Sequence, residues 1–169
     1  LGKIVEIARK YNIISVADNT VATPILFQPL SHGIDVSVHS ASKYINGQGS
    51  AIGGLIIERK GLNEKLIGNP RYAHFNEPDE SYHGLVYAQL PFPIFSLRIR
   101  LSLIRDIGAT ISPYNSWLLI QGLETLSLRI KEHSRNAYKV ASFLKSHPKV
   151  KHVSYPALES DALHVRAKQ

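Results

Sequence analysis

The sequence predicts an α/β fold, and three observations along the chain predict it. A helical pattern opens the chain and is followed at once by a short apolar run. A second apolar run ends in a cluster of serine and lysine, and a third follows a glycine-rich stretch. Helices alternating with short apolar strands are typical of α/β proteins. With 44% hydrophobic residues in 169, the chain is long enough to bury a core.

The first predicted element is a helix whose apolar residues share one face. These residues are Ile4, Ile7, Ala8 and Tyr11. Because no capping residue precedes them, we expect the chain to be an incomplete segment whose true N-terminus lies upstream. Residues 13–17 follow as a short buried strand, which ends at Asp18-Asn19-Thr20 before a proline-containing loop.

Two further strands are predicted at residues 36–39 and 51–58, on either side of glycine-rich sequence. The first of them runs into Ser40-Ala41-Ser42-Lys43. Two strands therefore deliver polar residues at their carboxyl ends, Asp18 from one and the serine-lysine cluster from the other. Open α/β sheets bind ligands at these ends, so we expect the functional site there.

The second half of the chain is predicted to be helical after a long connection. Residues 69–95 are rich in proline and aromatic residues and have weak periodicity. Connections of this length are usually functional or disordered. A long helix is predicted from Pro113 onward, with Ser112 as its N-cap. A helical pattern continues from Ser127 until His147-Pro148 stops it.

The composition excludes several kinds of site. The sequence contains no cysteine, so it offers no disulfide, thiolate nucleophile or cysteine-based zinc site. Its eight histidines do not fall at the spacing of a metal-binding motif, so no metal is expected. No membrane span and no signal peptide is readable, so we expect a cytoplasmic protein with no membrane partner.

The formal charge of +7 invites comparison with nucleic-acid-binding proteins. Residues 129–169 hold nine Lys and Arg against three Asp and Glu, whereas the first 128 residues are nearly neutral. The basic residues are spread through a helical pattern without interleaved aromatic residues. This distribution favours a solvated helix face, and we expect no nucleic-acid partner.

Ser40, Ser42 and Lys43 place two hydroxyls beside an amine. In an extended segment, alternation puts Ser40 and Ser42 on one side, where both could hydrogen-bond a phosphate. The alternative is a polar strand end that binds no ligand. Asp18 has a similar alternative, as a cap for the loop that follows it. Each of these signals is weak when taken separately.

Their combination is more specific, because pyridoxal 5'-phosphate requires a lysine for the Schiff base, donors for its phosphate and a carboxylate beside its ring nitrogen. All three kinds of residue stand at the ends of the predicted strands. The ordered segments that carry them resemble the Cys/Met metabolism pyridoxal phosphate family. These segments are Val16-Ala17-Asp18-Asn19-Thr20, residues 35–39, Ser40-Ala41-Ser42-Lys43-Tyr44 and Gly53-Gly54.

The resemblance implies a role for each of these polar residues. It implies that Lys43 is the catalytic lysine that carries the cofactor, that Asp18 pairs with the pyridinium nitrogen, and that Ser40 and Ser42 contact the phosphate. Thr20 is assigned near the cofactor ring, although a local turn would satisfy its hydroxyl about as often. The family more often has threonine where this chain has Ser42, and serine keeps the hydroxyl.

The resemblance also implies a fold, two domains and an assembly. The expected fold is part of the large domain of an aspartate-aminotransferase-like pyridoxal phosphate-dependent transferase, with a mixed, mostly parallel sheet flanked by helices. Residues 1–126 would form the C-terminal part of this cofactor-binding domain. Residues 127–169 would form a connecting helix and the start of the small C-terminal domain. The implied assembly is a homo-oligomer, a tetramer built as a dimer of dimers.

Within the family, later segments resemble the O-acetylhomoserine sulfhydrylase branch. These segments are residues 78–84, 103–109, 112–115 and 121–126. The branch implies a γ-replacement in which O-acetyl-L-homoserine and sulfide give L-homocysteine and acetate. The alternatives within the family are a cystathionine γ-synthase and a methionine or cystathionine γ-lyase. The alternative outside it is a non-enzymatic, basic α/β binding module.

Overall fold

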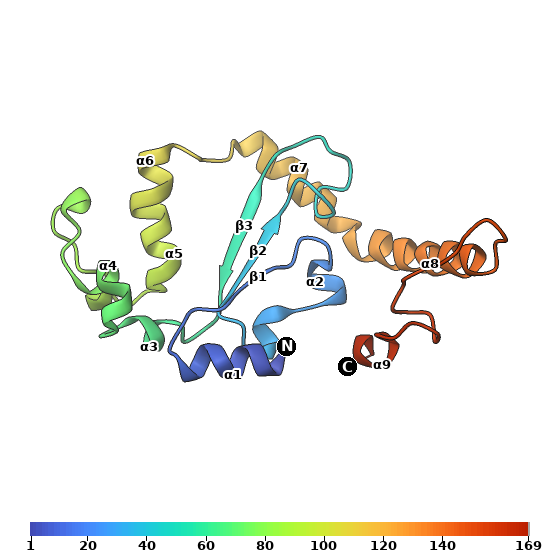
Figure 1. The fold of residues 1–169 in the computed structure, drawn as a ribbon. Coiled ribbons are helices and arrows are strands. Elements are labelled where there is room, and N and C mark those ends of the chain that lie inside the picture. The colour runs from blue at the N-terminus through green and yellow to red at the C-terminus, as the bar shows by residue number, and fades with distance from the viewer. Residues whose placement is uncertain (169) are drawn as a thin grey trace. The chain divides into compact units, whose positions relative to one another are not determined.

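The computed structural model describes residues 1–168 and divides the chain into two compact units. The first unit is Leu1–Glu124, and the second begins at Thr125. The α-helices of the first unit are α1 (Gly2–Lys10), α2 (Thr23–Leu26), α3 (Asn63–Leu66), α4 (Ala73–Asn76), α5 (Ile94–Arg98), α6 (Arg105–Ile107) and α7 (Pro113–Glu124), and a π-helical segment, Ile99–Ile104, joins α5 to α6. Those of the second are α8 (Leu126–Lys145) and α9 (His164–Ala167) (Figure 1). The assignment of residues 1–126 and 127–169 to a large and a small domain stays a prediction.

A small mixed sheet in the first unit confirms the α/β class. Its strands lie in the order β1 (Val16–Asp18), β2 (Val36–Ser40) and β3 (Gly54–Glu58). β1 and β2 are parallel, with Asp18 opposite Val38. β2 and β3 are antiparallel, with Ser40 opposite Gly54 and Val36 opposite Glu58. The carboxyl ends of β1 and β2 therefore lie at the same end of the sheet as the start of β3 (Figure 1).

β1 starts later than predicted, and an aspartate side chain binds the residue before it. Ser15 N and Ser15 Oγ both donate to Asp35 Oδ2, each at 2.9 Å. The Asp35 carboxylate is 1% exposed and also accepts from Lys65 Nζ at 2.6 Å and from Arg59 at 3.2 Å. These contacts tie the starts of β1 and β2 to the segment that follows β3.

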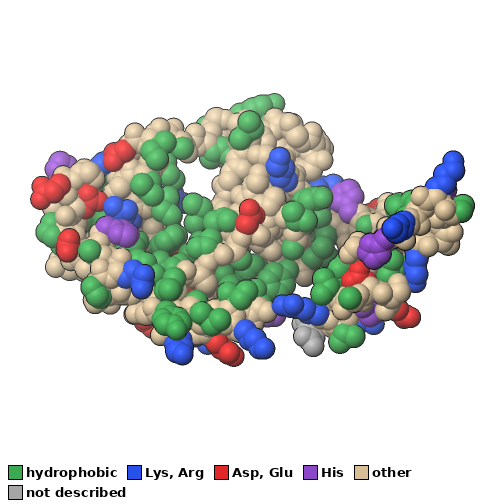
Figure 2. All heavy atoms as spheres, viewed as in Figure 1, with side chains coloured by type: hydrophobic (Ala, Val, Ile, Leu, Met, Phe, Trp, Pro, Cys, Tyr) green, Lys and Arg blue, Asp and Glu red, His purple; other side chains and the backbone are tan. Residues whose placement is uncertain are grey.

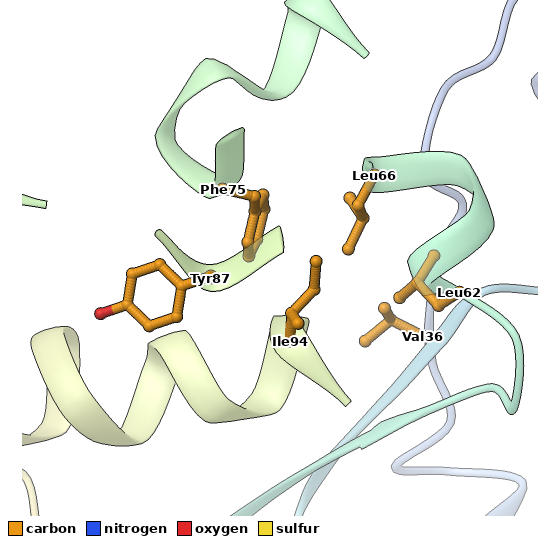
Figure 3. Packing of buried hydrophobic residues seen from close by; sticks show 6 residues of the cluster. All are labelled: Val36, Leu62, Leu66, Phe75, Tyr87 and Ile94. Carbon is orange, nitrogen blue, oxygen red and sulfur yellow. The ribbon is translucent and has the colours of Figure 1, made fainter. Parts of the chain in front are cut away.

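The hydrophobic core of the first unit depends on the long connection at residues 69–95. The cluster consists of Val36, Leu62, Leu66, Phe75, Tyr87 and Ile94 (Figure 3). Three of its members come from this connection, which folds into short helical turns. Aromatic side chains bury more apolar surface than any other residue type, so the aromatic content of the connection stabilises the core.

α7 begins as the sequence predicts. Ser112 Oγ accepts a hydrogen bond from Asn115 N at 3.1 Å, and Pro113 is the first helical residue. α8 ends at Lys145, just before His147-Pro148. No helix among residues 1–168 is long and apolar enough to cross a membrane.

α1 buries only part of the apolar face that the sequence predicts for it. Of the residues on that face, Ala8 is buried together with Val5, whereas Ile4, Ile7 and Tyr11 are exposed. The Val5 side chain packs against Gly33, just before β2. The sheet also exposes apolar side chains, since Val16 is 58% exposed and Ile56 49%. Figure 2 shows hydrophobic side chains reaching the surface over the region of the sheet.

Candidate functional site

The carboxyl end of β1 presents Asp18 and Thr20. Asp18 is exposed, and its Oδ1 accepts a hydrogen bond from Thr20 N at 3.0 Å. The Thr20 hydroxyl has the largest effect on the pKa of Asp18 and lowers it, and the Thr20 backbone N–H lowers it further. A small loss of hydration opposes these effects and raises the pKa, whereas the nearby His39 lowers it further. The carboxylate form of Asp18 is therefore favoured.

A hydrogen bond from Ser40 to Thr20 joins the ends of β1 and β2. Ser40 N donates to Thr20 Oγ1 at 2.7 Å. Asn19 N donates to Val38 O at 2.9 Å in the same region. The Thr20 hydroxyl therefore bonds outside its own turn, because it accepts from Ser40 N on the neighbouring strand. This bond brings Asp18 and Ser40 to one place.

The chain turns directly after Ser40 instead of continuing as a strand. Lys43 N donates to Ser40 O at 3.2 Å, and Asn46 N donates to Ala41 O at 2.9 Å. The prediction that strand alternation places Ser40 and Ser42 on one side is therefore wrong, because the extended backbone ends at Ser40. Any ligand that contacts both hydroxyls must meet them across a turn.

The two serine hydroxyls have different surroundings. Ser42 Oγ accepts from Gly53 N at 3.0 Å and lies 3.3 Å from Gly53 O, so it links the turn to the residue before β3. The Ser40 hydroxyl has no hydrogen-bond partner among residues 1–168 and is half-buried. Ser40 can therefore donate freely to a ligand, whereas Ser42 is already engaged with backbone.

Lys43 is exposed, and its amine makes no ion pair or hydrogen bond within the described part of the chain. The loop that follows it is fixed by Asn46, which is 3% exposed. Asn46 Nδ2 donates to Ala51 O at 3.2 Å, and its Oδ1 accepts from Gln48 N at 3.2 Å and from Ser50 Oγ at 3.1 Å. This role of Asn46 was not predicted from the sequence. The available signal was the Asn-Gly dipeptide, which marks turns.

His39 is a second residue that the sequence reasoning left unassigned. It is 8% exposed, and its Nε2 lies 3.2 Å from Ser37 Oγ. Its Nδ1 is buried with no partner among residues 1–168. Burial lowers the pKa of His39, and the Asp18 carboxylate opposes this shift. A hollow of about 290 Å³ beside it is lined by His39, Ser37, Asn19 and neighbouring residues, and by none of the five predicted site residues.

The structure brings Asp18, Thr20 and Ser40 together, with Ser42 and Lys43 on the adjoining turn. A stabilised carboxylate, an unpaired hydroxyl and an unpaired amine are the groups that a phosphate-bearing aldehyde with a basic ring nitrogen requires. The residues present therefore fit pyridoxal 5'-phosphate. Among residues 1–168, no three His, Asp or Glu side chains gather as metal ligands would.

Comparison with protein families identifies relatives along the entire chain. The family model described as Cys/Met metabolism PLP-dependent enzyme matches residues 1–169. The chain is 42% identical over 178 residues to an O-acetyl-L-homoserine sulfhydrylase from Leptospira meyeri. The match covers 100% of this chain and 40% of the relative. It is also 42% identical over 158 residues to the O-acetyl-L-homoserine sulfhydrylase of Corynebacterium glutamicum, and this match covers 92% of this chain and 36% of the relative. The chain thus spans about two fifths of the length of these relatives.

Solved structures match the fold closely. A crystal structure described as an O-acetylhomoserine (thiol)-lyase from Campylobacter jejuni superposes with a TM-score of 0.96 at 57% identity, covering 99% of this chain and 40% of that one. One lysine of that protein is present as N'-pyridoxyl-lysine-5'-monophosphate. A cystathionine γ-lyase from Lactobacillus plantarum superposes with a TM-score of 0.72 at 32% identity, and the match covers 99% of this chain and 35% of that one.

Proposed function

Because the chain belongs to the Cys/Met metabolism PLP-dependent enzyme family, we propose that it serves in an enzyme that converts O-acetyl-L-homoserine and sulfide to L-homocysteine and acetate. The observation that carries this proposal is the likeness, over nearly the whole chain, to the thiol-lyase structure. The two sulfhydrylase relatives support the same donor and acceptor. The γ-lyase structure superposes less well, which favours the sulfhydrylase branch over a lyase.

Pyridoxal 5'-phosphate supplies an electron sink for negative charge that develops beside the substrate amino group. Asp18 holds a proton on the cofactor's ring nitrogen, and its lowered pKa keeps the carboxylate available for this role. Thr20 keeps Asp18 in place, because its backbone N–H binds the carboxylate while its hydroxyl accepts from Ser40 N.

Ser40 would donate a hydrogen bond from its unpaired hydroxyl to the cofactor phosphate. Ser42 contributes a weaker contact, because Gly53 already occupies part of its hydrogen-bonding capacity. Lys43 would hold the cofactor through its aldehyde carbon, and its amine would take and return protons at Cα and Cβ of the substrate. The exposed position of Lys43 beyond β2 leaves its side chain able to reach both partners.

The proposal extends to the fold and the assembly. In it, residues 1–126 are the C-terminal part of an aspartate-aminotransferase-like large domain, and residues 127–169 begin the small domain. The enzyme acts in the cytoplasm as a homotetramer. The family match along the chain and the likeness to a thiol-lyase structure support the fold and domain part of this extension.

Acceptor choice tests the reaction. The full-length protein, loaded with pyridoxal 5'-phosphate, is given O-acetyl-L-homoserine with sulfide or with cysteine, and separately methionine alone. We expect homocysteine to form from sulfide faster than cystathionine forms from cysteine. An equal or faster rate with cysteine would reassign the protein to the cystathionine γ-synthases. Rapid breakdown of methionine without an acceptor would reassign it to the lyases.

A further inference from the structure

We propose that Gly122 is a positioning residue for Lys43, because its missing Cβ lets the backbone of α7 pack directly on the turn that carries the lysine. The inference rests on the proposed function, in which Lys43 bonds to the cofactor. It adds a residue far from Lys43 in sequence and outside the polar cluster at the ends of β1 and β2.

The position of Lys43 depends on its backbone. Its amine has no hydrogen bond or ion pair with any residue in the range 1–168. The turn is held by backbone hydrogen bonds, from Asn46 N to Ala41 O at 2.9 Å and from Gly47 N to Lys43 O at 2.8 Å. Whatever fixes the backbone of residues 41–47 therefore fixes where the lysine side chain starts.

Gly122 contacts this turn at backbone distance. It is buried in α7 and has ordinary helical dihedral angles, so a positive φ does not explain the glycine. A Cβ added to it would lie 2.6 Å from Asn46 O and 2.9 Å from Asn46 Cα, and nearer still to Ile45 O. Because these are backbone atoms, they cannot rotate away. Glycine weakens a helix relative to alanine, and this close approach supplies a packing reason for it.

α7 makes a second contact with the same region through Leu119. A Cβ added to Gly53 would lie 2.7 Å from Leu119 Cδ1 and 3.0 Å from Ile111 Cδ1. Gly53 is also the residue that binds the Ser42 hydroxyl. In Figure 1, α7 lies beside the end of β2 and the start of β3. Side-chain ends can shift, so the contact at Gly122 is the less tolerant of the two.

An alanine at position 122 would require α7 and the turn to separate by about 1 Å, and a displacement of that size in a catalytic group costs on the order of 100-fold in rate. Asp18, Thr20 and Ser40 are linked to one another across β1 and β2, and within residues 1–168 they make no hydrogen bond to α7. Cofactor affinity should therefore change less than turnover. This split distinguishes positioning of Lys43 from a general loss of structure.

The test compares full-length wild type with Gly122→Ala and with Gly2→Ala. Gly2 is also helical, but a Cβ there would meet nothing within 4 Å, so it controls for the substitution itself. Hydrogen exchange of residues 41–47 is measured without cofactor, and then pyridoxal 5'-phosphate affinity and turnover are measured. We expect Gly122→Ala to exchange faster in this segment and to turn over on the order of 100-fold more slowly, with cofactor affinity largely kept. Gly2→Ala should match wild type in all three.

Wild-type exchange and turnover in Gly122→Ala would overturn the inference and leave the proposed function standing. A wild-type protein that never joins the cofactor to Lys43 would refute the proposed function, and faster exchange in Gly122→Ala would still support the packing. If Gly122→Ala does not fold, Leu119→Ala loosens the second contact without adding an atom. Faster exchange of residues 41–47 in that variant supports the inference, and unchanged exchange overturns it.

Discussion

The buried Asp35 carboxylate gives a stability prediction whose magnitude follows from its contacts. Asp35→Asn keeps the side-chain shape and removes the charge that faces Lys65 Nζ at 2.6 Å and Arg59 at 3.2 Å. The Lys65 side chain is 11% exposed, so its ammonium would lie largely buried without a counter-charge. Breaking a buried pair in this way costs about 3–5 kcal/mol. We expect Asp35→Asn to lower the free energy of unfolding by about 3 kcal/mol, at the low end of this range, because Arg59 is 33% exposed and water can solvate it.

This change is measured by urea unfolding of the full-length protein without cofactor. Asp106→Asn is the matched control, because Asp106 also forms a pair with arginine, at 2.7 Å, but is 52% exposed. The control should change stability little, as surface pairs contribute little. Adding Lys65→Met to Asp35→Asn should recover part of the loss, because the uncompensated charge is removed.

The pH dependence of stability checks the same cluster. Burial has the largest single effect on the pKa of Asp35 and raises it, but the hydrogen bonds from Lys65, Ser15 and Arg59 together outweigh burial and lower the pKa. A lowered pKa contributes stability above the unfolded value of about 3.9, and this contribution is lost as the pH falls below it. Wild type should therefore lose more stability than Asp35→Asn on acidification below about pH 4. Equal acid sensitivity, or Asp35→Asn as stable as Asp106→Asn at neutral pH, would refute the reasoning.

Three predictions concern the site itself. Asp18→Asn should retain some cofactor and lose most turnover, because an amide cannot keep the ring nitrogen protonated; wild-type turnover would contradict this. Thr20→Val should raise the pKa of Asp18 toward its ordinary value and move the acidic limb of the rate profile to higher pH; an unmoved limb would exclude this role. Ser40→Ala should weaken cofactor binding by about 1.5–3 kcal/mol, which is the contribution of a hydrogen bond to a charged group. Ser42→Ala should mainly destabilise the fold, because it leaves Gly53 N unpaired. Titration with pyridoxal 5'-phosphate and thermal unfolding separate the two serine variants, and the reverse pattern would exchange their roles.

The strand ends could be predicted because polar residues interrupt short apolar runs. Asp18 and Ser40 both lie where the sequence placed the carboxyl ends of strands. The contact between Thr20 and Ser40 could not be predicted, because it joins residues on different strands and local sequence does not specify which side chains meet. The packing of Gly122 on residues 45 and 46 could not be predicted for the same reason, because these residues are far apart in the sequence.

Two local patterns also misled the sequence reasoning. Alternation placed Ser42 beside Ser40, but the backbone turns once Ala41 is buried and Lys43 N binds Ser40 O. Residues 69–95 lack clear periodicity, yet they supply Phe75, Tyr87 and Ile94 to the core, since short turns can bury side chains without a repeating pattern. The roles of Lys43, Asp18, Thr20, Ser40 and Ser42 toward the cofactor stay predictions.

The identity of the cofactor lysine is the most direct test of the proposed function. The full-length protein with pyridoxal 5'-phosphate is reduced with borohydride, digested and mapped, alongside Lys43→Ala and the control Lys60→Ala. Lys60 follows β3 at the end of the sheet away from Ser40, and Lys65 Nζ is bound to Asp35. We predict that the label is recovered on Lys43, is lost in Lys43→Ala and is kept in Lys60→Ala. Label recovered on Lys60 or Lys65 in the wild-type protein would contradict the assignment of the site.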